Sequence, residues 1–177
     1  MNDLRFTVFA GISRDGFLAT TDGSLEWLEQ AADASEDYGF DTFLASVDAM
    51  VLGRASFDHV RTAGEFPFGD LPVYVMSHRD VETDWPVTRV SGSVTELCNL
   101  WQRNGHRHMS IDGANVLSQF LAAGLVDELI LTIAPVELGE GIALFSVRAD
   151  ADNFVAIGDD QRWPSGMVQR RYKRRSG

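Results

Sequence analysis

Short apolar runs separated by polar turns recur along this chain of 177 residues. The runs are continuous and β-prone, the pattern of strands buried on both faces of a sheet. Between them, apolar residues recur at helical spacing, and the capping box Ser93-Val94-Thr95-Glu96 predicts the start of one helix. Alternating strands and helices predict one α/β domain over residues 1–177. The predicted buried strands are 5–12, 50–52, 73–76 and 129–133, and a C-terminal antiparallel hairpin is predicted at 153–158 and 167–173.

The stretch Ser110–Pro135 predicts a strand, a glycine turn, a helix and a second strand. The turn is Asp112-Gly113-Ala114-Asn115, and Gly124 stands where a left-handed residue ends a helix. A helix that begins directly after a strand presents unpaired backbone N–H groups and the positive end of its dipole. The turn is therefore a candidate phosphate site, although an ordinary strand–helix connection has the same pattern.

Two more predicted strands end in polar residues suited to phosphate. Gly53 and Arg54 follow one strand at the expected start of a helix, and Ser77-His78-Arg79 follows another. Ligands of open α/β sheets bind beyond the carboxyl ends of the strands. Three such ends at one edge predict a site for a long anionic ligand, while a solvated polar loop remains the alternative for Ser77–Arg79.

Three carboxylates near residue 40 are candidate acids. The pattern predicts a helix that begins near Ser35, with Phe40, Phe43, Leu44 and Val47 on its buried face. On that helix Asp37 lies roughly 70° and Asp41 roughly 110° from the centre of the buried face. Glu36 lies nearer the centre than either, so the periodicity does not choose among them.

Charge and cysteine content narrow the function classes. The net charge of −11 argues against general affinity for nucleic acid or anionic membranes. The single cysteine, Cys98, excludes an intramolecular disulfide and fits a reducing compartment, and the start of the sequence shows no secretory signal or membrane span. We therefore expect a cytoplasmic protein. His106 and His108 lack a third ligand at metal-site spacing, so no metal site is predicted.

Five segments resemble the dihydrofolate reductase-like superfamily, above all stand-alone relatives of the reductase domain of bifunctional riboflavin-biosynthesis enzymes. Ser13–Ala19 is similar to a Ser-x-Asp-Gly-x-Ile-Ala loop, and Val51–Phe57 to a Gly-Arg-x-Thr-aromatic motif with serine in place of threonine. Met76–Arg79 resembles the segment that receives the adenosine 2′-phosphate. Ile111–Leu121 resembles the glycine-rich turn and helix under the pyrophosphate. Gly124–Phe145 matches the ending of the riboflavin-type reductases and is the most specific of the five.

The resemblance implies a three-layer α/β fold with a mixed, mostly parallel eight-stranded sheet flanked by helices. It also implies a homodimer and hydride transfer from NADPH to a small planar heterocycle, such as a pterin, a pyrimidine or a riboflavin precursor. The cofactor residues that it implies are Gly53, Arg54 and Ser56 on the phosphates, Ser77, His78 and Arg79 around the 2′-phosphate, Gly113, Ala114, Asn115 and Val116 under the pyrophosphate, and Ala10, Leu18 and Ala19 along the nicotinamide.

The same resemblance implies the substrate side of the site. Counted back from Gly53, Asp37 falls where dihydrofolate reductases keep their pterin-binding carboxylate, so Asp37 is the candidate catalytic acid. A reduced C=N or C=O group also needs a proton, from such an acid or from a positioned water. Asp15, Trp27 and Phe57 are the candidate substrate contacts.

One turn departs from the family pattern. Asp112-Gly113-Ala114 stands where the family commonly has consecutive glycines, so Ala114 adds a methyl group and Asp112 a negative charge near the expected pyrophosphate. The deaminase half of the riboflavin enzymes is absent, so a full role in that pathway is not predicted. The alternative function is a non-catalytic nucleotide- or ligand-binding protein of the same fold.

Overall fold

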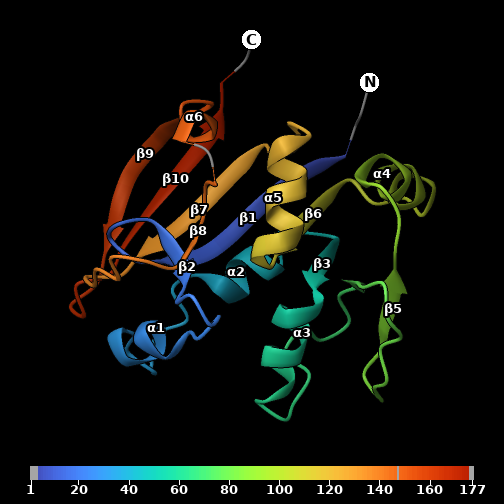
Figure 1. The fold of residues 1–177 in the computed structure, drawn as a ribbon, viewed down its shortest axis with the longest axis horizontal. Coiled ribbons are helices and arrows are strands. Elements are labelled where there is room, and N and C mark those ends of the chain that lie inside the picture. The colour runs from blue at the N-terminus through green and yellow to red at the C-terminus, as the bar shows by residue number, and fades with distance from the viewer. Residues whose placement is uncertain (1–3, 147, 176–177) are drawn as a thin grey trace. The chain divides into compact units, whose positions relative to one another are not determined.

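Eight strands form one hydrogen-bonded sheet in the order β5-β4-β3-β6-β1-β7-β10-β9, and β2 pairs with β8 separately. The structure is a computed structural model that describes residues 4–146 and 148–175, and Figure 1 labels its elements. β3 is parallel to β4 and β6, and β4 to β5, whereas β10 is antiparallel to β7 and β9. The predicted mixed, mostly parallel eight-stranded sheet is thereby confirmed. By their contacts, the residues group into two units, 1–7 with 41–125 and 8–40 with 126–177, so the single domain stays a prediction.

The first unit contains the parallel strands and the helices that connect them. β3 and β4 are short, almost wholly buried apolar runs, and β6 is buried over its three central residues, as expected for strands covered on both faces. The predicted capping box begins α4, where the Ser93 hydroxyl accepts from the Glu96 N–H group. The elements are β3 Ala49–Gly53, α3 Arg54–Arg61, β4 Val73–Met76, β5 Val87–Val90, α4 Val94–Arg103, β6 His108–Asp112 and α5 Ala114–Ala122, with the first residues of β1 Arg5–Ile12.

Three aromatic side chains form the centre of this unit. Phe6, Trp101 and Phe120 are all fully buried. The ring of Phe6 lies edge-on to Phe120 with the centroids 4.9 Å apart, and Trp101 stacks on Phe120 at 6.2 Å. These three residues come from a strand and two helices, so their packing fixes α4 and α5 against the strands.

The second unit contains the rest of β1 and the C-terminal antiparallel strands. The predicted hairpin is confirmed, since β9 and β10 pair antiparallel, with β9 mostly exposed and β10 largely half-buried. A small apolar cluster of Tyr38, Ala134 and Met167 lies under Trp27 and Trp163. The elements are β2 Phe17–Ala19, α1 Glu26–Ala31, β7 Glu128–Ile133, β8 Ile142–Ala143, α6 Arg148–Ala151, β9 Phe154–Arg162 and β10 Val168–Arg174, and α2 Phe40–Leu44 spans the boundary between the units.

The helix predicted from Ser35 is wrong, because α2 begins only at Phe40. Tyr38 has a φ of +53° and Gly39 a φ of +81°, both incompatible with a right-handed helix. Tyr38 is nonetheless held, because its ring packs on Trp163 and its hydroxyl accepts from the Asp33 N–H group at 2.8 Å. Tertiary packing therefore overrides the helical spacing in this segment.

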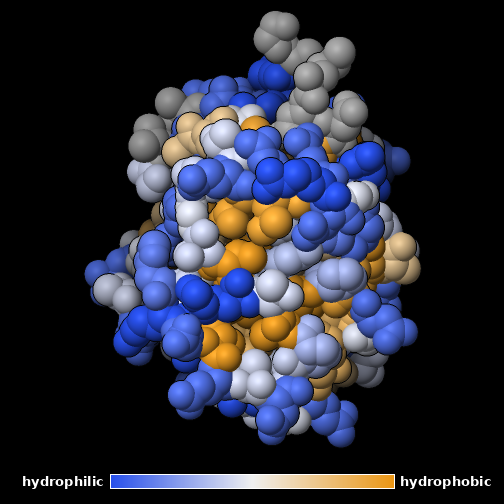
Figure 2. All heavy atoms as spheres, turned by 90° about the vertical axis from the view of Figure 1, so that its right-hand side faces the viewer, coloured by the Kyte–Doolittle hydropathy of each residue, from blue (hydrophilic) through white to orange (hydrophobic). Residues whose placement is uncertain are grey.

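The surface carries mixed side chains. Figure 2 shows one face on which hydrophobic residues form interrupted patches framed by hydrophilic ones, an ordinary appearance for a folded chain. Within the described residues, no helix has the length and apolar character needed to cross a membrane.

Candidate cofactor site

Two glycines meet where β3 and β6 end. Leu52 of β3 is in register with Asp112 of β6, so the following residues Gly53 and Gly113 are neighbours. A Cβ atom on Gly113 would lie 3.1 Å from the Gly53 nitrogen and 2.9 Å from Ser56 Oγ. Gly113 also has a φ of +99°, which favours glycine. The sequence thus uses glycine here to let two strand–helix turns approach within contact distance.

This contact places two helix N-termini side by side. Gly53 is the N-cap of α3 and Gly113 the N-cap of α5, and neither helix start has a side-chain cap. The unpaired N–H groups and the positive dipole ends of both helices therefore gather at one edge of the sheet. A phosphate or pyrophosphate is the ligand that such an arrangement favours.

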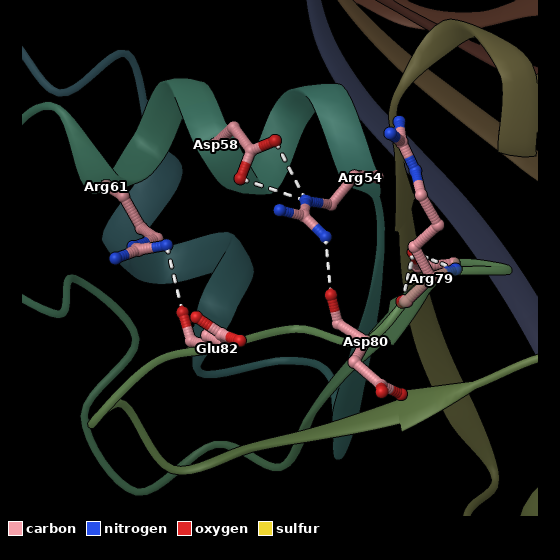
Figure 3. Close-up of polar contacts among 7 residues, drawn as sticks. Arg54, Asp58, Arg61, Arg79, Asp80 and Glu82 are labelled. Carbon is pink, nitrogen blue, oxygen red and sulfur yellow. Dashed lines mark hydrogen bonds and ion pairs between the residues drawn. The ribbon is translucent and has the colours of Figure 1, made fainter.

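Arg54 adds a full positive charge to the same point. It occupies the first position of α3, where a cation opposes the helix dipole and an acid would be stabilising. Its Nε donates to both Asp58 oxygens, at 3.0 and 2.8 Å, and its Nη1 donates to the Asp80 carbonyl at 2.9 Å (Figure 3). The guanidinium carries five N–H donors, more than these contacts use. A positive charge at this position lowers the stability of α3 and increases the attraction of its N-terminus for an anion.

The third predicted strand end joins the other two. Met76 at the end of β4 is in register with Gly53, so Ser77–Asp80 follows directly beside the start of α3. We call Ser77–Asp80 the 77–80 loop. Ser77 is buried, and its hydroxyl donates to the Arg79 carbonyl at 2.7 Å and accepts from the Arg79 N–H group at 3.2 Å. His78 and Arg79 are exposed. The convergence of three polar strand ends is confirmed. Contact of Ser77, His78 and Arg79 with a 2′-phosphate stays a prediction.

The first turn of α5 offers backbone rather than side chains. Val116 is buried, and its side chain lies 3.3 Å from where a Cβ of Gly53 would stand. Asn115 is exposed and its Oδ1 accepts from Gln119 at 2.9 Å. Ala114 is half-buried. Contact between these residues and a pyrophosphate stays a prediction, in which the N–H groups are the donors.

Asp112 bends back onto its own turn. Its Oδ1 accepts from the Gly113 N–H group at 2.8 Å and therefore occupies a donor that a phosphate would use. Burial raises the pKa of this carboxyl, an effect opposed by the Gly113 N–H group and by the positive charge of His59 on α3. An acid with a raised pKa in the folded state is destabilising when ionised.

Asp112→Asn should therefore stabilise the protein at pH 7, since asparagine keeps the acceptor and removes the charge. The contribution of Asp112 to the stability of the wild type should fall as pH rises from 3.8, the ordinary value, through its raised pKa, so the gain of the variant should vanish below pH 3.8. Thermal unfolding across this pH range measures it, with Asp70→Asn, an exposed loop acid, as the control. An equal gain in the control, or a gain that persists at low pH, would contradict this account.

Asp15 is held by loops of the second unit. Its carboxylate accepts from the Ser13 hydroxyl at 2.6 Å and from the N–H groups of Leu138 and Gly139 at 3.1 and 2.7 Å. The hydrogen bond from Ser13 is the main reason why the pKa of Asp15 is lowered to about 2, with the two N–H groups contributing. These contacts join the turn after β1 to the segment after β7, so Asp15 is a structural residue here. Its contact with substrate stays a prediction.

Asp15→Asn is expected to lower the melting temperature at neutral pH, because the amide accepts weaker hydrogen bonds from the same donors. Because the pKa of Asp15 is lowered in the folded state, the ionised carboxylate contributes its full stabilisation above the ordinary value of 3.8. That stabilisation is lost as the pH falls through about 2. The two proteins should therefore converge as the pH approaches 2. Asp159→Asn, on the exposed part of β9, controls for the loss of one charge. A constant difference across this range would rule the explanation out.

The other substrate candidates have different surroundings. Asp37 is exposed, and its Oδ1 accepts from the Gly39 N–H group at 2.9 Å. Glu36 and Asp41 are exposed as well. Trp27 is half-buried on α1, with a buried indole N–H group that has no hydrogen-bond partner among the described residues. Phe57 is fully buried and lies edge-on to Trp85. Catalysis by Asp37 and substrate contact by Trp27 and Phe57 stay predictions.

The residues predicted along the nicotinamide belong to the second unit. Ala10 and Leu18 are half-buried on β1 and β2, and Ala19 is buried beside Gly141. The cofactor role of these three residues stays a prediction.

No group of three or more His, Cys, Asp or Glu side chains able to hold a metal ion occurs among the described residues. Burial raises the pKa of the Cys98 thiol to about 11, so this cysteine is a structural apolar residue.

Two side chains at the site, Arg89 and Asp58, are not among the residues that the motifs of the sequence identify. Arg89 of β5 donates from Nη1 to the Ser77 carbonyl at 3.1 Å, and Asp58 fixes Arg54 from one helical turn away. The spacing of four residues between Arg54 and Asp58 is a sequence signal that could have identified that pair. Arg89 has no comparable local signal, because its contact depends on the pairing of β4 with β5.

The eight-stranded mixed sheet with its connecting helices has a dihydrofolate reductase-like fold. The family model for the RibD C-terminal domain matches residues 6–151, and the chain belongs to this family. Two uncharacterized Bacillus subtilis (strain 168) proteins are similar. YwjB is 33% identical over 78% of this chain and 80% of its own, and YyaP is 28% identical over 93% and 92%.

Solved structures agree with this assignment. A protein of Shewanella sp. PV-4, provisionally named a riboflavin biosynthesis protein, has a TM-score of 0.86 and 28% identity over 98% of this chain and 100% of its own. Dihydrofolate reductase from Enterococcus faecalis, in complex with NADP(H), has a TM-score of 0.69 and 14% identity over 97% of each chain, a likeness of fold alone.

Proposed function

We propose that the chain is an NADPH-dependent reductase that acts on a small planar heterocycle. The observation that carries the proposal is the meeting of two helix N-termini at Gly53 and Gly113 with Arg54 beside them. The family supports a reductase, and one structural neighbour was solved with NADP(H). The substrate classes proposed are pterins, pyrimidines and riboflavin precursors such as 5-amino-6-(5-phosphoribosylamino)uracil, since a Thermotoga maritima enzyme named for reduction of that uracil shares the fold.

The residues present fit the phosphates of this cofactor. Gly53 and Gly113 carry no side chains of their own, so a pyrophosphate could approach the backbone N–H groups of the two turns, of which the Gly113 N–H group would have to be released by Asp112. Arg54 is suited to bind a phosphate oxygen pair, and the exposed His78 and Arg79 are suited to the 2′-phosphate that distinguishes NADPH from NADH. When bound, NADPH supplies the hydride, and the protein orients it and excludes competing reactions.

The substrate side of the proposal lies in the second unit. Trp27 carries the buried indole N–H group described above, a donor that a heterocycle could satisfy. Asp37 is proposed as the proton source, in keeping with the need for a proton in the reduction of a C=N or C=O group. Asp37→Asn should then lower turnover while leaving NADPH binding unchanged.

Turnover separates the reductase from a binding protein of the same fold. The loss of NADPH absorbance is measured with a panel of pterins, pyrimidines and riboflavin precursors. Oxidation of NADPH that depends on one of these compounds supports the reductase. NADPH binding without oxidation across the whole panel would instead support the non-catalytic alternative.

We also propose that the chain forms a homodimer and resides in the cytoplasm. The support for the dimer is the edge strand β9, which exposes Val155 and Ile157 and has one neighbour in the sheet. Light scattering after size-exclusion chromatography should give twice the chain mass of 19.5 kDa. A mass of one chain would rule out the dimer. The single cysteine is the support for a reducing compartment.

A further inference from the structure

Arg89 connects the edge strand β5 to the proposed 2′-phosphate site. The strand is short, with Thr88 and Arg89 exposed and Val90 buried. The Arg89 side chain turns toward the neighbouring strand end, where Nη1 donates to the Ser77 carbonyl at 3.1 Å and Nε lies 3.5 Å from Asp80 Oδ1. The Ser77 N–H group donates to the Val90 carbonyl at 3.0 Å. Both backbone groups of Ser77 are therefore held from β5.

The rest of the 77–80 loop is fixed at its other end. Arg54 of α3 donates to the Asp80 carbonyl, so arginines from two different elements hold the first and the last residue of the loop. The Ser77 hydroxyl closes the turn between them. Figure 3 shows the Arg79 side chain extending away from the Asp80 carboxylate. The Arg79 guanidinium and the Asp80 carboxylate of the loop therefore point in different directions.

The charge of Asp80 would oppose the binding of a phosphate by the 77–80 loop, and Arg89 lies where it can offset that charge. The Asp80 side chain is 93% exposed, and a free carboxylate three residues from Ser77 would repel a dianionic 2′-phosphate. The ion pair with Arg89 offsets part of this charge and holds the Asp80 carboxylate toward β5. Its second contact, with the Ser77 carbonyl, keeps Ser77 in the position where its hydroxyl can shape the turn.

We propose that Arg89 is a positioning residue for cofactor selectivity: it shapes the 77–80 loop and neutralises Asp80, so that His78 and Arg79 favour NADPH over NADH. This inference rests on the proposed NADPH site. It assigns to β5 a role in recognition that neither the motifs nor the family membership gives to Arg89. A residue that only supported the fold would affect both cofactors alike.

Calorimetric titration of NADPH and NADH into the wild type, Arg89→Ala, Arg89→Lys and Thr88→Ala tests this inference. Arg89→Ala should reduce the preference for NADPH by roughly fivefold, the upper range for an exposed ion pair, and leave NADH binding unchanged. Arg89→Lys should recover part of the preference, because a lysine can still neutralise Asp80. Thr88→Ala, the neighbouring exposed position, should keep it entirely and controls for weakening of the edge strand.

The outcomes are distinguishable. If the wild type prefers NADPH and Arg89→Ala keeps the same preference, Arg89 is not a positioning residue and the proposed function stands. If Arg89→Ala weakens both cofactors equally, Arg89 acts through the fold and the inference is wrong. If the wild type binds neither cofactor, the proposed function fails and the inference fails with it. If Arg89→Ala does not fold, the ratio of NADPH to NADH affinity of Arg89→Lys decides: a partial loss of the preference supports the inference, and an unchanged ratio overturns it.

Discussion

Gly113→Ala should unfold more easily than the wild type by roughly 3 kcal/mol and should lose NADPH binding. The residue has a φ of +99° and a ψ of +127°, a conformation that side chains rarely adopt. The added Cβ would also stand 3.1 Å from the Gly53 nitrogen and 3.2 Å from the Gly53 Cα. These are backbone atoms of the adjoining turn, so relief requires the two turns to separate. Chemical denaturation measures the loss of stability.

Gly105→Ala is the matched control for this substitution. Gly105 has a similar φ of +91° and lies in the same unit, but nothing stands within 4 Å of where its Cβ would be. Gly105→Ala should lower the free energy of unfolding by about 1 kcal/mol, the penalty for a left-handed backbone alone. NADPH binding should survive. Equal losses in the two variants would mean that the contact between Gly53 and Gly113 contributes nothing.

Arg54→Ala should weaken NADPH binding by roughly a hundredfold, because charge-assisted hydrogen bonds to phosphate are lost. Stability should change little, since the pair with Asp58 is partly exposed, with 34% and 48% of the two side chains accessible. A large effect on binding with a small effect on folding is the pattern of a binding residue. Calorimetric titration gives the first quantity and thermal unfolding the second.

The structure offers a matched control on the same helix. Arg61 lies two turns after Arg54 and also donates to a backbone carbonyl of the segment after β4, that of Glu82, at 3.2 Å (Figure 3). Its guanidinium lies over the Phe57 ring, 5.7 Å from the centroid. Arg61→Ala removes an equivalent tether away from the helix N-terminus and should leave NADPH binding intact. A similar loss of binding in both variants would show that Arg54 acts by holding the segment, and the phosphate assignment would be wrong.

The parts of the site that could be predicted from the sequence are those with local causes. Gly53 and Gly113 could be identified because each follows a predicted strand. Gly113 has a φ of +99° that favours glycine, whereas Gly53, with an ordinary φ of −69°, lies where the Val116 side chain comes close. The capping box at Ser93 is equally local and is confirmed. The alternation of strands and helices predicted the α/β class, and the mixed eight-stranded sheet was implied by the family resemblance that these motifs carry.

The parts that were missed depend on contacts between distant residues. β5 has two exposed residues in its middle and becomes a strand only by pairing with β4, so Arg89 carries no local sign of its role. The segment after Ser35 has helical spacing, but Tyr38 turns it with a positive φ that packing against Trp163 maintains. Asp112 could be identified as a departure, but its bond to the Gly113 N–H group could not be predicted.

The most direct test of the central claim is the melting temperature of the wild type with NADPH, with NADH and without cofactor. A cofactor that binds the folded state alone, at a hundredfold excess over its dissociation constant, stabilises by about 2.7 kcal/mol. In a chain of this size that raises the melting temperature by about 5 to 10 °C. The two helix N-termini, Arg54 and the 77–80 loop predict this rise with NADPH and a clearly smaller one with NADH. Equal shifts with the two cofactors, or no shift with either, would contradict the account.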